Sequence, residues 1–255
     1  GAFGPGTYTL MTCNSLTGDA SNLKAGGVLG DSRYTPSFDV SGASIGLTIG
    51  GTPMALTWSG GNNANTWDVK NTANWNSGTE KFFQLDSVTF DDTGSVSPAV
   101  NVVGGVFPGT VTFNGAQSYT LSGAGKITGG ASIVHNSSGT LTILTTNDNV
   151  GAIDINGGAL QIGNGVTADG ALGTGPLNLN YGGLILNSAG AQSIANALSG
   201  YGQITKRGPG VAVLSGASAS YQGSIVIEAG TLQAGSGTAM GGSTGGLTNT
   251  AGGTL

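Results

Sequence analysis

The stretch Ile153-Asp-Ile-Asn-Gly-Gly-Ala-Leu-Gln-Ile162 decides the fold. Apolar and polar residues alternate on both sides of a glycine pair, and a period of two predicts short β-strands with one buried face. The glycines predict a corner between the strands, because glycine adopts positive φ without a steric penalty. Two short strands and a corner cannot bury a core alone, so the stretch needs stacked neighbours of the same kind.

The pattern returns as Leu177-Asn-Leu-Asn-Tyr-Gly-Gly-Leu-Ile-Leu186 and as Ile225-Val-Ile-Glu-Ala-Gly-Thr-Leu-Gln-Ala234. Counting from Leu141, we place equivalent apolar positions at successive gaps of 19, 24, 27, 21 and 23 residues. These positions are Leu160, Leu184, Val211, Leu232 and Leu255. Their mean spacing approximates one coil of a three-sided parallel β-helix, in which each inward side chain stacks on its equivalent in the next coil.

The composition supports a folded β protein with many tight corners. Glycine accounts for 50 of 255 residues and charged residues for 7%, whereas ordinary domains have about 7% glycine and about 25% charged residues. Hydrophobic residues make up 38% and alternate in register, which argues against disorder. Few charges suit solenoid faces, because like charges stacked on adjacent coils repel each other.

Charge and hydropathy restrict the partners. The net charge of −5, with 7 scattered basic residues, argues against nucleic acid. No apolar run approaches the ~20 residues of a membrane span. No signal peptide is visible, and the chain starts and stops within repeats, so we expect a segment of a longer or processed protein. Cys13 is the single cysteine, and we expect it to be a small buried side chain.

We therefore predict an all-β fold in three parts. Residues 1–57 form a small, mainly antiparallel β unit, residues 58–99 form a Trp-containing cap, and residues 100–255 form a parallel β-helix. The end coil of such a stack leaves backbone groups unpaired and invites another strand. We assign Tyr8, Leu10 and Leu255 to an interface for self-association.

The cap contains the only tryptophans of the chain, Trp58, Trp67 and Trp75, with Asn and Asp crowded between them. Two interpretations stay open. The rings can plug the open end of the solenoid, because solenoid ends need a cap over the exposed core. Alternatively, they can form an exposed stacking platform for sugar rings.

Candidate metal ligands are few. Asp86, Asp91 and Asp92 form a weak candidate site for Ca²⁺, which takes oxygen ligands; the alternative is a solvated turn. His135 is the only histidine, and we expect it at the surface or at a corner. With one histidine and one cysteine, we expect no His/Cys metal site and no cofactor.

Enzymes are a serious alternative, because parallel β-helices include polysaccharide lyases and hydrolases. Such enzymes need clustered carboxylates with Arg or Lys. Asp148 and Asp154 are the only acids between residues 100 and 165, and Lys126 is the only base there. Lys206 and Arg207 have no acid nearby in the sequence. We therefore expect no catalytic pair and no enzymatic activity.

Two adjoining segments carry a more specific pattern. Gly202-Gln-Ile-Thr-Lys-Arg-Gly-Pro-Gly-Val-Ala-Val-Leu-Ser-Gly216 and then Tyr221-Gln-Gly-Ser-Ile-Val-Ile-Glu-Ala-Gly-Thr-Leu-Gln233 contain Lys-x-Gly-x-Gly, Leu-Ser-Gly, Tyr-x-Gly and Gly-Thr-Leu. This region resembles the autotransporter-associated β-strand repeat, also called the passenger-associated transport repeat. It departs from the family at residues 207–209 and at Val211, where Leu is commoner. Residues 56–92 and 5–18 also resemble the start and the end of repeat blocks in large bacterial surface proteins.

The resemblance implies a right-handed β-helix of a secreted or surface-displayed bacterial protein, without an enzymatic role, that aids export or folding. Our first hypothesis is an extracellular stalk or filament segment that assembles end to end. The second is an adhesin module that binds glycans on its Asn/Thr-rich faces or its tryptophans. The third is a polysaccharide lyase or hydrolase.

Overall fold

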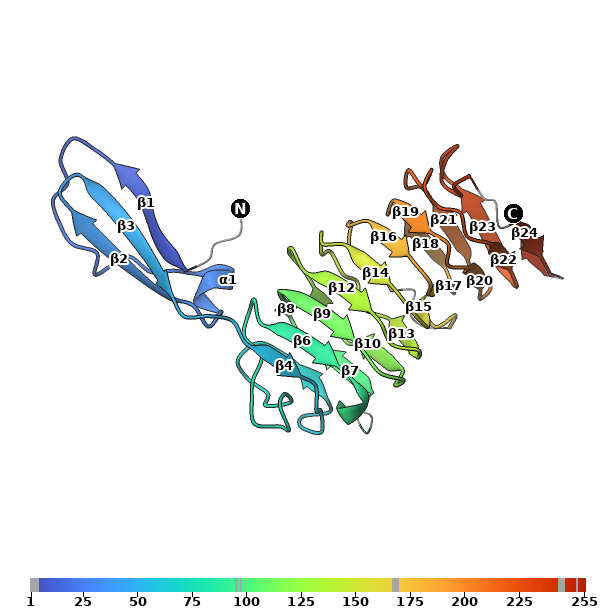
Figure 1. Cartoon of the computed structure of the whole chain (residues 1–255), viewed down its shortest axis with the longest axis horizontal. Coiled ribbons are helices and arrows are strands. Elements are labelled where there is room, and N and C mark those ends of the chain that lie inside the picture. Colours follow the sequence, from blue (N-terminus) through green and yellow to red (C-terminus); the bar gives the residue numbers. More distant parts are fainter. Residues whose placement is uncertain (1–4, 95, 97, 167–169, 243–245, 251) are drawn as a thin grey trace.

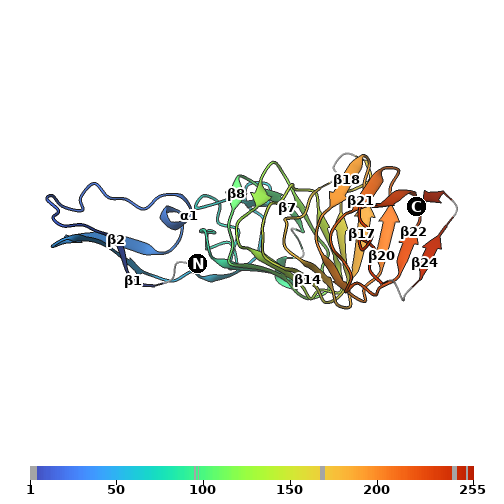
Figure 2. The ribbon, with the colours of Figure 1, turned by 90° about the horizontal axis from the view of Figure 1, so that it is seen from above.

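The computed structural model describes residues 5–94, 96, 98–166, 170–242, 246–250 and 252–255. A three-stranded antiparallel sheet, here called the arm, projects from one end of a parallel β-solenoid of about eight turns (Figure 1). The view from above shows the arm and the solenoid following each other along one long axis (Figure 2). The predicted all-β fold, with a small antiparallel unit, a Trp-containing cap and a parallel β-helix, is confirmed.

The arm contains β1 (Gly6–Thr12), β2 (Thr35–Ser41) and β3 (Ser44–Gly50), with β3 in the middle. A short helix, α1 (Gly27–Gly30), lies in the connection from β1 to β2. Tyr8, Leu47 and Phe38 lie side by side across the three strands, which places them on one face of the arm. Cys13, just after β1, is half-buried rather than buried as we predicted.

The solenoid has three faces, and two of them are continuous parallel sheets. The first face has seven strands, in spatial order β4 (Ala55–Thr57), β6 (Ser87–Phe90), β9 (Thr110–Phe113), β12 (Ser132–His135), β14 (Ile153–Ile155), β16 (Leu177–Leu179) and β19 (Leu198–Gly200). The second face has nine, β5 (Thr66–Trp67), β7 (Ala99–Val102), β10 (Tyr119–Ser122), β13 (Thr140–Ile143), β15 (Ala159–Ile162), β17 (Gly183–Asn187), β20 (Ile204–Arg207), β22 (Ile225–Ile227) and β24 (Leu247–Asn249).

The third face is less regular. It begins with β8 (Gly105–Val106) and β11 (Lys126–Ile127) and ends with β18 (Ala191–Ile194), β21 (Val211–Leu214), β23 (Gly230–Ala234) and β25 (Gly253–Thr254). The first two of these strands form one sheet and the last four form another. In the coils between the two sheets, residues 145–150 and 171–174 pair through one bridge and a few backbone hydrogen bonds. A 3₁₀ turn, η1 (Asp92–Gly94), lies between β6 and β7.

Alternation along each strand sends one set of side chains inward. On the second face, Leu141, Leu160, Leu184, Ile204 and Ile225 lie one above the other and are almost wholly buried. Burial of each such side chain contributes about 1.5–3 kcal/mol. These columns join the buried tryptophans, Trp58, Trp67 and Trp75, to the last coils in one continuous core.

The predicted column of equivalent leucines is right for Leu141, Leu160 and Leu184 and wrong for the other positions. Leu232 is buried, but it lies on the third face and pairs with Ala212. Val211 faces outward, and Leu255 is exposed. The motif has shifted to the third face at Leu232, and Val211 is in addition one residue out of register, because it pairs with Thr231 while Ala212 takes the inward position.

The motif of residues 153–162 turns different corners in different coils. In residues 153–162 it runs from the first face to the second, through β14 and β15. In residues 225–234 it runs from the second face to the third, through β22 and β23. Gly158 and Gly230 occupy the same motif position and have φ of 50° and 68°, a conformation that favours glycine. The motif therefore specifies a corner, and it does not specify a face.

Parallel pairing begins at β4, which pairs with β6. Residues 58–86 then supply β5 and the long loops that cover the end of the first coil (Figure 1). The division into residues 1–57, 58–99 and 100–255 stays a prediction.

Candidate functional site

The three tryptophans form one buried aromatic cluster, here called the Trp cap, together with Phe82 and Phe90. All five rings are fully buried. The ring centroids of Trp58 and Trp75 are 5.0 Å apart, and those of Trp67 and Trp75 are 5.5 Å apart, in edge-to-face geometry. Such aromatic pairs contribute about 0.5–1.5 kcal/mol beyond the area that they bury. The cluster closes the end of the hydrophobic core.

The Asn-rich loops around the Trp cap have a local explanation. Asn63 and Asn65 adopt positive φ, which asparagine tolerates better than most residues. The buried Asn74 amide donates to Asn62 O at 3.0 Å and to Thr66 O at 2.8 Å. The amide side chains thus supply the hydrogen bonds that irregular backbone over a core requires.

The burial of the tryptophans corrects one alternative. A platform for sugar stacking needs exposed ring faces, and Trp58, Trp67 and Trp75 expose none. Sequence alone does not separate the two interpretations, because a plug and a platform both need clustered aromatic residues.

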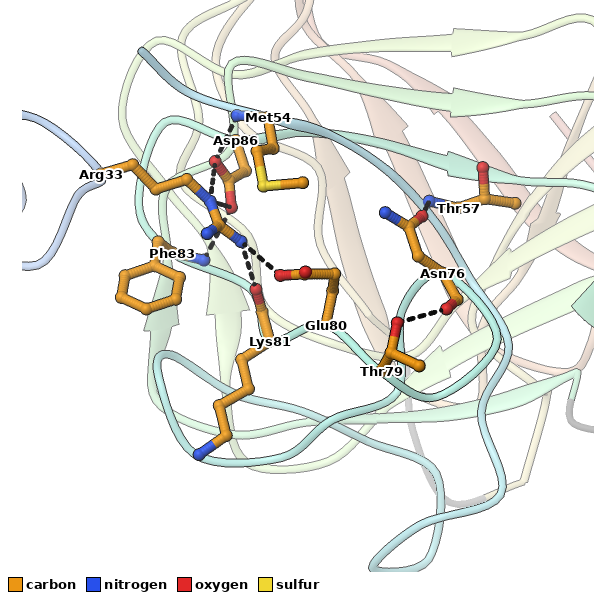
Figure 3. A network of polar contacts seen from close by, with 9 residues as sticks. All are labelled: Arg33, Met54, Thr57, Asn76, Thr79, Glu80, Lys81, Phe83 and Asp86. Carbon is orange, nitrogen blue, oxygen red and sulfur yellow. Dashed lines mark hydrogen bonds and ion pairs between the residues drawn. The ribbon is translucent and has the colours of Figure 1, made fainter. Parts of the chain in front are cut away.

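The arm is joined to the first coil through Arg33, which precedes β2 (Figure 3). Arg33 Nε lies 3.0 Å from both carboxylate oxygens of Asp86, a side chain with no exposed surface. Asp86 also accepts hydrogen bonds from the backbone N–H groups of Met54 at 2.7 Å and Phe83 at 3.0 Å. The carboxylate therefore has a partner on every side, which compensates for the loss of water around a buried charge.

Further contacts fix the guanidinium group of Arg33. Its carbon lies 4.4 Å from the centroid of the Phe83 ring, within the range of a cation–π interaction. Its Nη2 donates to Lys81 O at 2.8 Å and lies 3.3 Å from Glu80 Oε2 (Figure 3). We call Arg33, Glu80, Phe83 and Asp86 the Arg33 latch. Sequence reasoning missed it, because Arg33 and Asp86 lie 53 residues apart and no motif connects them.

The predicted calcium ligands do not come together. Asp86 is engaged in the latch, Asp91 Oδ1 accepts from Thr93 N at 2.9 Å, and Asp92 Oδ1 accepts from Ala116 N at 2.8 Å. Among the residues that the structure describes, no three His, Cys, Asp or Glu side chains gather as a metal site. The carboxylates of Asp91 and Asp92 instead hold turns, because they satisfy backbone N–H groups.

A polar pocket of about 520 Å³ lies on the outer side of the cap. It is lined by Thr57, Ser59, Asn76, Ser77, Asp91 and Thr93. Several of its polar atoms already hold the loops: Asn76 Oδ1 accepts from Thr57 N at 2.8 Å, and Ser59 Oγ accepts from Ser77 N at 2.7 Å. These contacts assign the lining to the architecture of the cap.

His135 is the last residue of β12, in register with Phe113 and Ile155, and is buried, so the predicted position at the surface or at a corner is wrong. Its Nε2 lies 3.1 Å from Gly139 O, and its ring packs edge-on against Phe113. Burial lowers the pKa of the imidazole below its ordinary value, and the hydrogen bond to Gly139 opposes this shift only in part.

The basic residues also have structural contacts. Lys206 is fully buried, and its Nζ donates to Gly208 O at 2.9 Å and to Ala229 O at 3.4 Å, which connects two consecutive corners. Arg207 forms an ion pair with Glu228 at 2.6 Å, an acid on the next coil that is distant in sequence. The ammonium of Lys206 thus supplies donors to corner carbonyls that the sheets leave unpaired.

The acids considered for catalysis are not paired with each other. Asp148 forms an ion pair with Lys126, and the hydrogen bond from Lys126 lowers the pKa of that carboxyl below its ordinary value. Asp154 lies on the first face and accepts a hydrogen bond from Asn178.

The residues assigned to self-association lie at the two ends of the molecule. Tyr8 and Leu10 lie on β1, an edge strand of the arm, and Leu10 is 49% exposed. Leu255 is 59% exposed and follows β25, an edge strand of the third face. Their assignment to an interface stays a prediction.

Comparison with known proteins adds one finding. The family model of the passenger-associated-transport-repeat matches residues 136–162 and 204–234. No curated protein and no solved structure matches the chain. None of the helices in the described part of the chain has the length and apolarity needed to span a bilayer.

Proposed function

This chain carries two passenger-associated-transport-repeats, and from that premise we propose that it is a structural, non-enzymatic segment of a secreted or cell-surface protein. The repeat and the β-solenoid both fit a passenger segment of an extracellular autotransporter. We further propose that the segment acts as a stalk or filament unit that assembles end to end.

The observation that supports the assembly is an exposed strand edge in the C-terminal part of the solenoid. β24 pairs with β22 and is the edge strand of the second face. Leu247 on this strand is 46% exposed, unlike Ile225, its buried neighbour in the preceding coil. An exposed strand edge is a template for another strand. A further coil or a second copy would bury Leu247 and Leu255.

The absence of enzymatic activity is proposed on the positions of the charged side chains. Asp148 is held in an ion pair with Lys126. The acid–base pair that glycoside hydrolysis requires needs two carboxyl groups facing one substrate. Asp148 and Asp154 instead lie on different faces of the solenoid.

Light scattering and electron microscopy test the assembly. We expect rods built from units joined end to end, and we expect the double variant Leu247→Lys, Leu255→Lys to remain monomeric because of like charge at the contact. Val150→Lys, at an exposed position away from the last coil, is the control and should assemble as the wild type does. Compact wild-type monomers at every concentration would rule out the filament role.

A further inference from the structure

Tyr181 and Tyr201 are the only large aromatic side chains exposed to solvent in the described part of the chain, at 88% and 70%. Both lie at the corner between the first and second faces, Tyr181 just after β16 and Tyr201 just after β19. The backbone N–H of Tyr201 donates to Leu179 O at 2.8 Å, so the tyrosines belong to consecutive coils. Strands of consecutive coils are about 4.8 Å apart, which is comparable to the length of one sugar ring.

A ladder of asparagine side chains runs along the same corner and ends beside Tyr181. Asn136 donates to Asn114 at 3.1 Å, Asn156 donates to Asn136 at 2.8 Å, and Asn180 donates to Asn156 at 2.7 Å. The carboxamide of Asn180 is thereby held in one orientation. No hydrogen bond to its Oδ1 occurs among the described residues, so an oriented acceptor is available at the residue that directly precedes Tyr181.

A second polar row lies on the outer side of the first face, in the same coils. Asn178 donates to Asp154 Oδ1 at 2.6 Å, and Ser199 donates to Asn178 Oδ1 at 2.8 Å. On the other side of the corner, Gln203 is exposed and donates to Ser224 Oγ at 3.2 Å. The exposed rings are thus framed by amide and hydroxyl groups, with Asp154 as the one charged member of the frame.

We propose that Tyr181, Tyr201 and Asn180 form a binding site for a neutral glycan on the side of the solenoid. Aromatic faces accept the apolar C–H faces of sugar rings, and fixed amides pair with sugar hydroxyls. The frame disfavours anionic ligands, because its one charge is a carboxylate and phosphate recognition needs basic side chains. Two rings are also far less than the ~800 Å² per partner of an ordinary protein interface.

This binding function goes beyond the structural role and does not depend on it. The site lies on the side of the solenoid, several coils from Leu10 of the arm, whereas the proposed assembly uses the two ends. A filament would repeat the site along its length, and multivalent binding then raises the overall affinity without any new contact.

Titration calorimetry and saturation-transfer NMR test the proposal with cellohexaose, chitohexaose and maltohexaose as neutral probes and trigalacturonate as the anionic one. We expect binding of at least one neutral probe and none of trigalacturonate. Tyr181→Ala with Tyr201→Ala should weaken binding about tenfold or more, since stacking on each ring is lost. Tyr181→Phe with Tyr201→Phe keeps both rings and should retain the affinity within about threefold.

A loss of binding should not reflect a folding defect, because both tyrosine side chains are exposed. All variants should therefore have the melting temperature of the wild type. The proposal is overturned if no neutral probe binds, or if the double alanine variant binds as well as the wild type. It is also overturned if the double alanine variant loses only self-association in light scattering, since the patch would then serve a protein partner. Leu247→Lys, Leu255→Lys should leave sugar binding unchanged, which separates failure of this site from failure of the assembly.

Discussion

Arg33 Nε is equidistant from the two carboxylate oxygens of Asp86, at 3.0 Å, and this pair spans the junction between the arm and the solenoid. The backbone between them at the junction, residues 51–54, has no strand of its own. The arm is therefore held to the first coil by the Arg33–Asp86 contact together with a backbone hydrogen bond from Gln84 N to Asp31 O at 2.9 Å, and no continuous sheet joins the two.

The first prediction concerns this pair. Arg33→Met should lower the free energy of unfolding by about 3–5 kcal/mol, because it leaves the buried Asp86 carboxylate without its cation. Amide hydrogen exchange at Met54 and Phe83, which both donate to Asp86, should accelerate. Lys126→Met is the matched control: it removes an exposed ion pair with Asp148, away from the arm, and should cost less than about 1 kcal/mol. Equal losses of unfolding free energy in the two variants would contradict a specific contribution of the Arg33–Asp86 pair to stability.

The second prediction concerns the Trp cap. Trp75 contacts Trp58, Trp67 and Phe90 and is fully buried. Trp75→Ala should therefore cost about 3–5 kcal/mol in urea unfolding, through lost burial and the cavity left behind. Iodide should barely quench tryptophan fluorescence in the wild type and should quench it strongly after unfolding. Strong quenching of the folded protein would contradict the closed cap.

The third prediction concerns pH. Because burial lowers the pKa of His135 in the folded state, the unfolded chain binds the proton more readily. The contribution of His135 is therefore complete above the unfolded pKa of about 6.5 and is lost as the pH falls below it, by at most about 1.4 kcal/mol per pH unit. Stability measured between pH 7.5 and 5 should decline in the wild type.

His135→Leu is the matched control for that measurement, since leucine fills the inward position without a titratable group. The decline between pH 6.5 and 5 should flatten in this variant. A parallel decline in both proteins would place the responsible group elsewhere.

The fourth prediction concerns the two equivalent corners. A Cβ atom at Gly158 would collide with Gly139 O, and one at Gly230 would collide with Gly208 O. Both residues also have positive φ, so Gly158→Ala and Gly230→Ala should each destabilise by more than about 1 kcal/mol. Gly130→Ala is the control, because its Cβ would meet no atom within 4 Å, and it should change stability by less than about 0.5 kcal/mol. A neutral effect at only one of the two corners would show that they differ.

The alternation around Leu160 and Leu184 was sufficient to predict strands, corners and their stacking, because one buried side per strand is a local property. It was not sufficient to assign faces. Leu160 and Leu232 follow the same motif, yet the first lies on the second face and the second on the third. Every strand of a three-sided coil has an inward side, so the motif looks the same wherever it occurs.

Other features depend on distances that a sequence does not contain. The Arg33 latch joins residues that only folding brings together, and the burial of Trp58 depends on loops that cover it. Conversely, the sequence shows Lys206 only as a base with no acid nearby, whereas in the structure it is buried and the corner carbonyls of two coils supply its acceptors. Its place in the Lys-x-Gly-x-Gly pattern was visible, and the reason for a lysine there was not.

The freedom of the corner motif to move between faces has a consequence for how such chains grow. A duplication does not have to insert a complete coil. One additional strand with its corner is enough to keep the hydrophobic core closed. All strands after the insertion are then rotated around the long axis by a third of a circle. The same outward-facing side chains can therefore face a different neighbouring molecule.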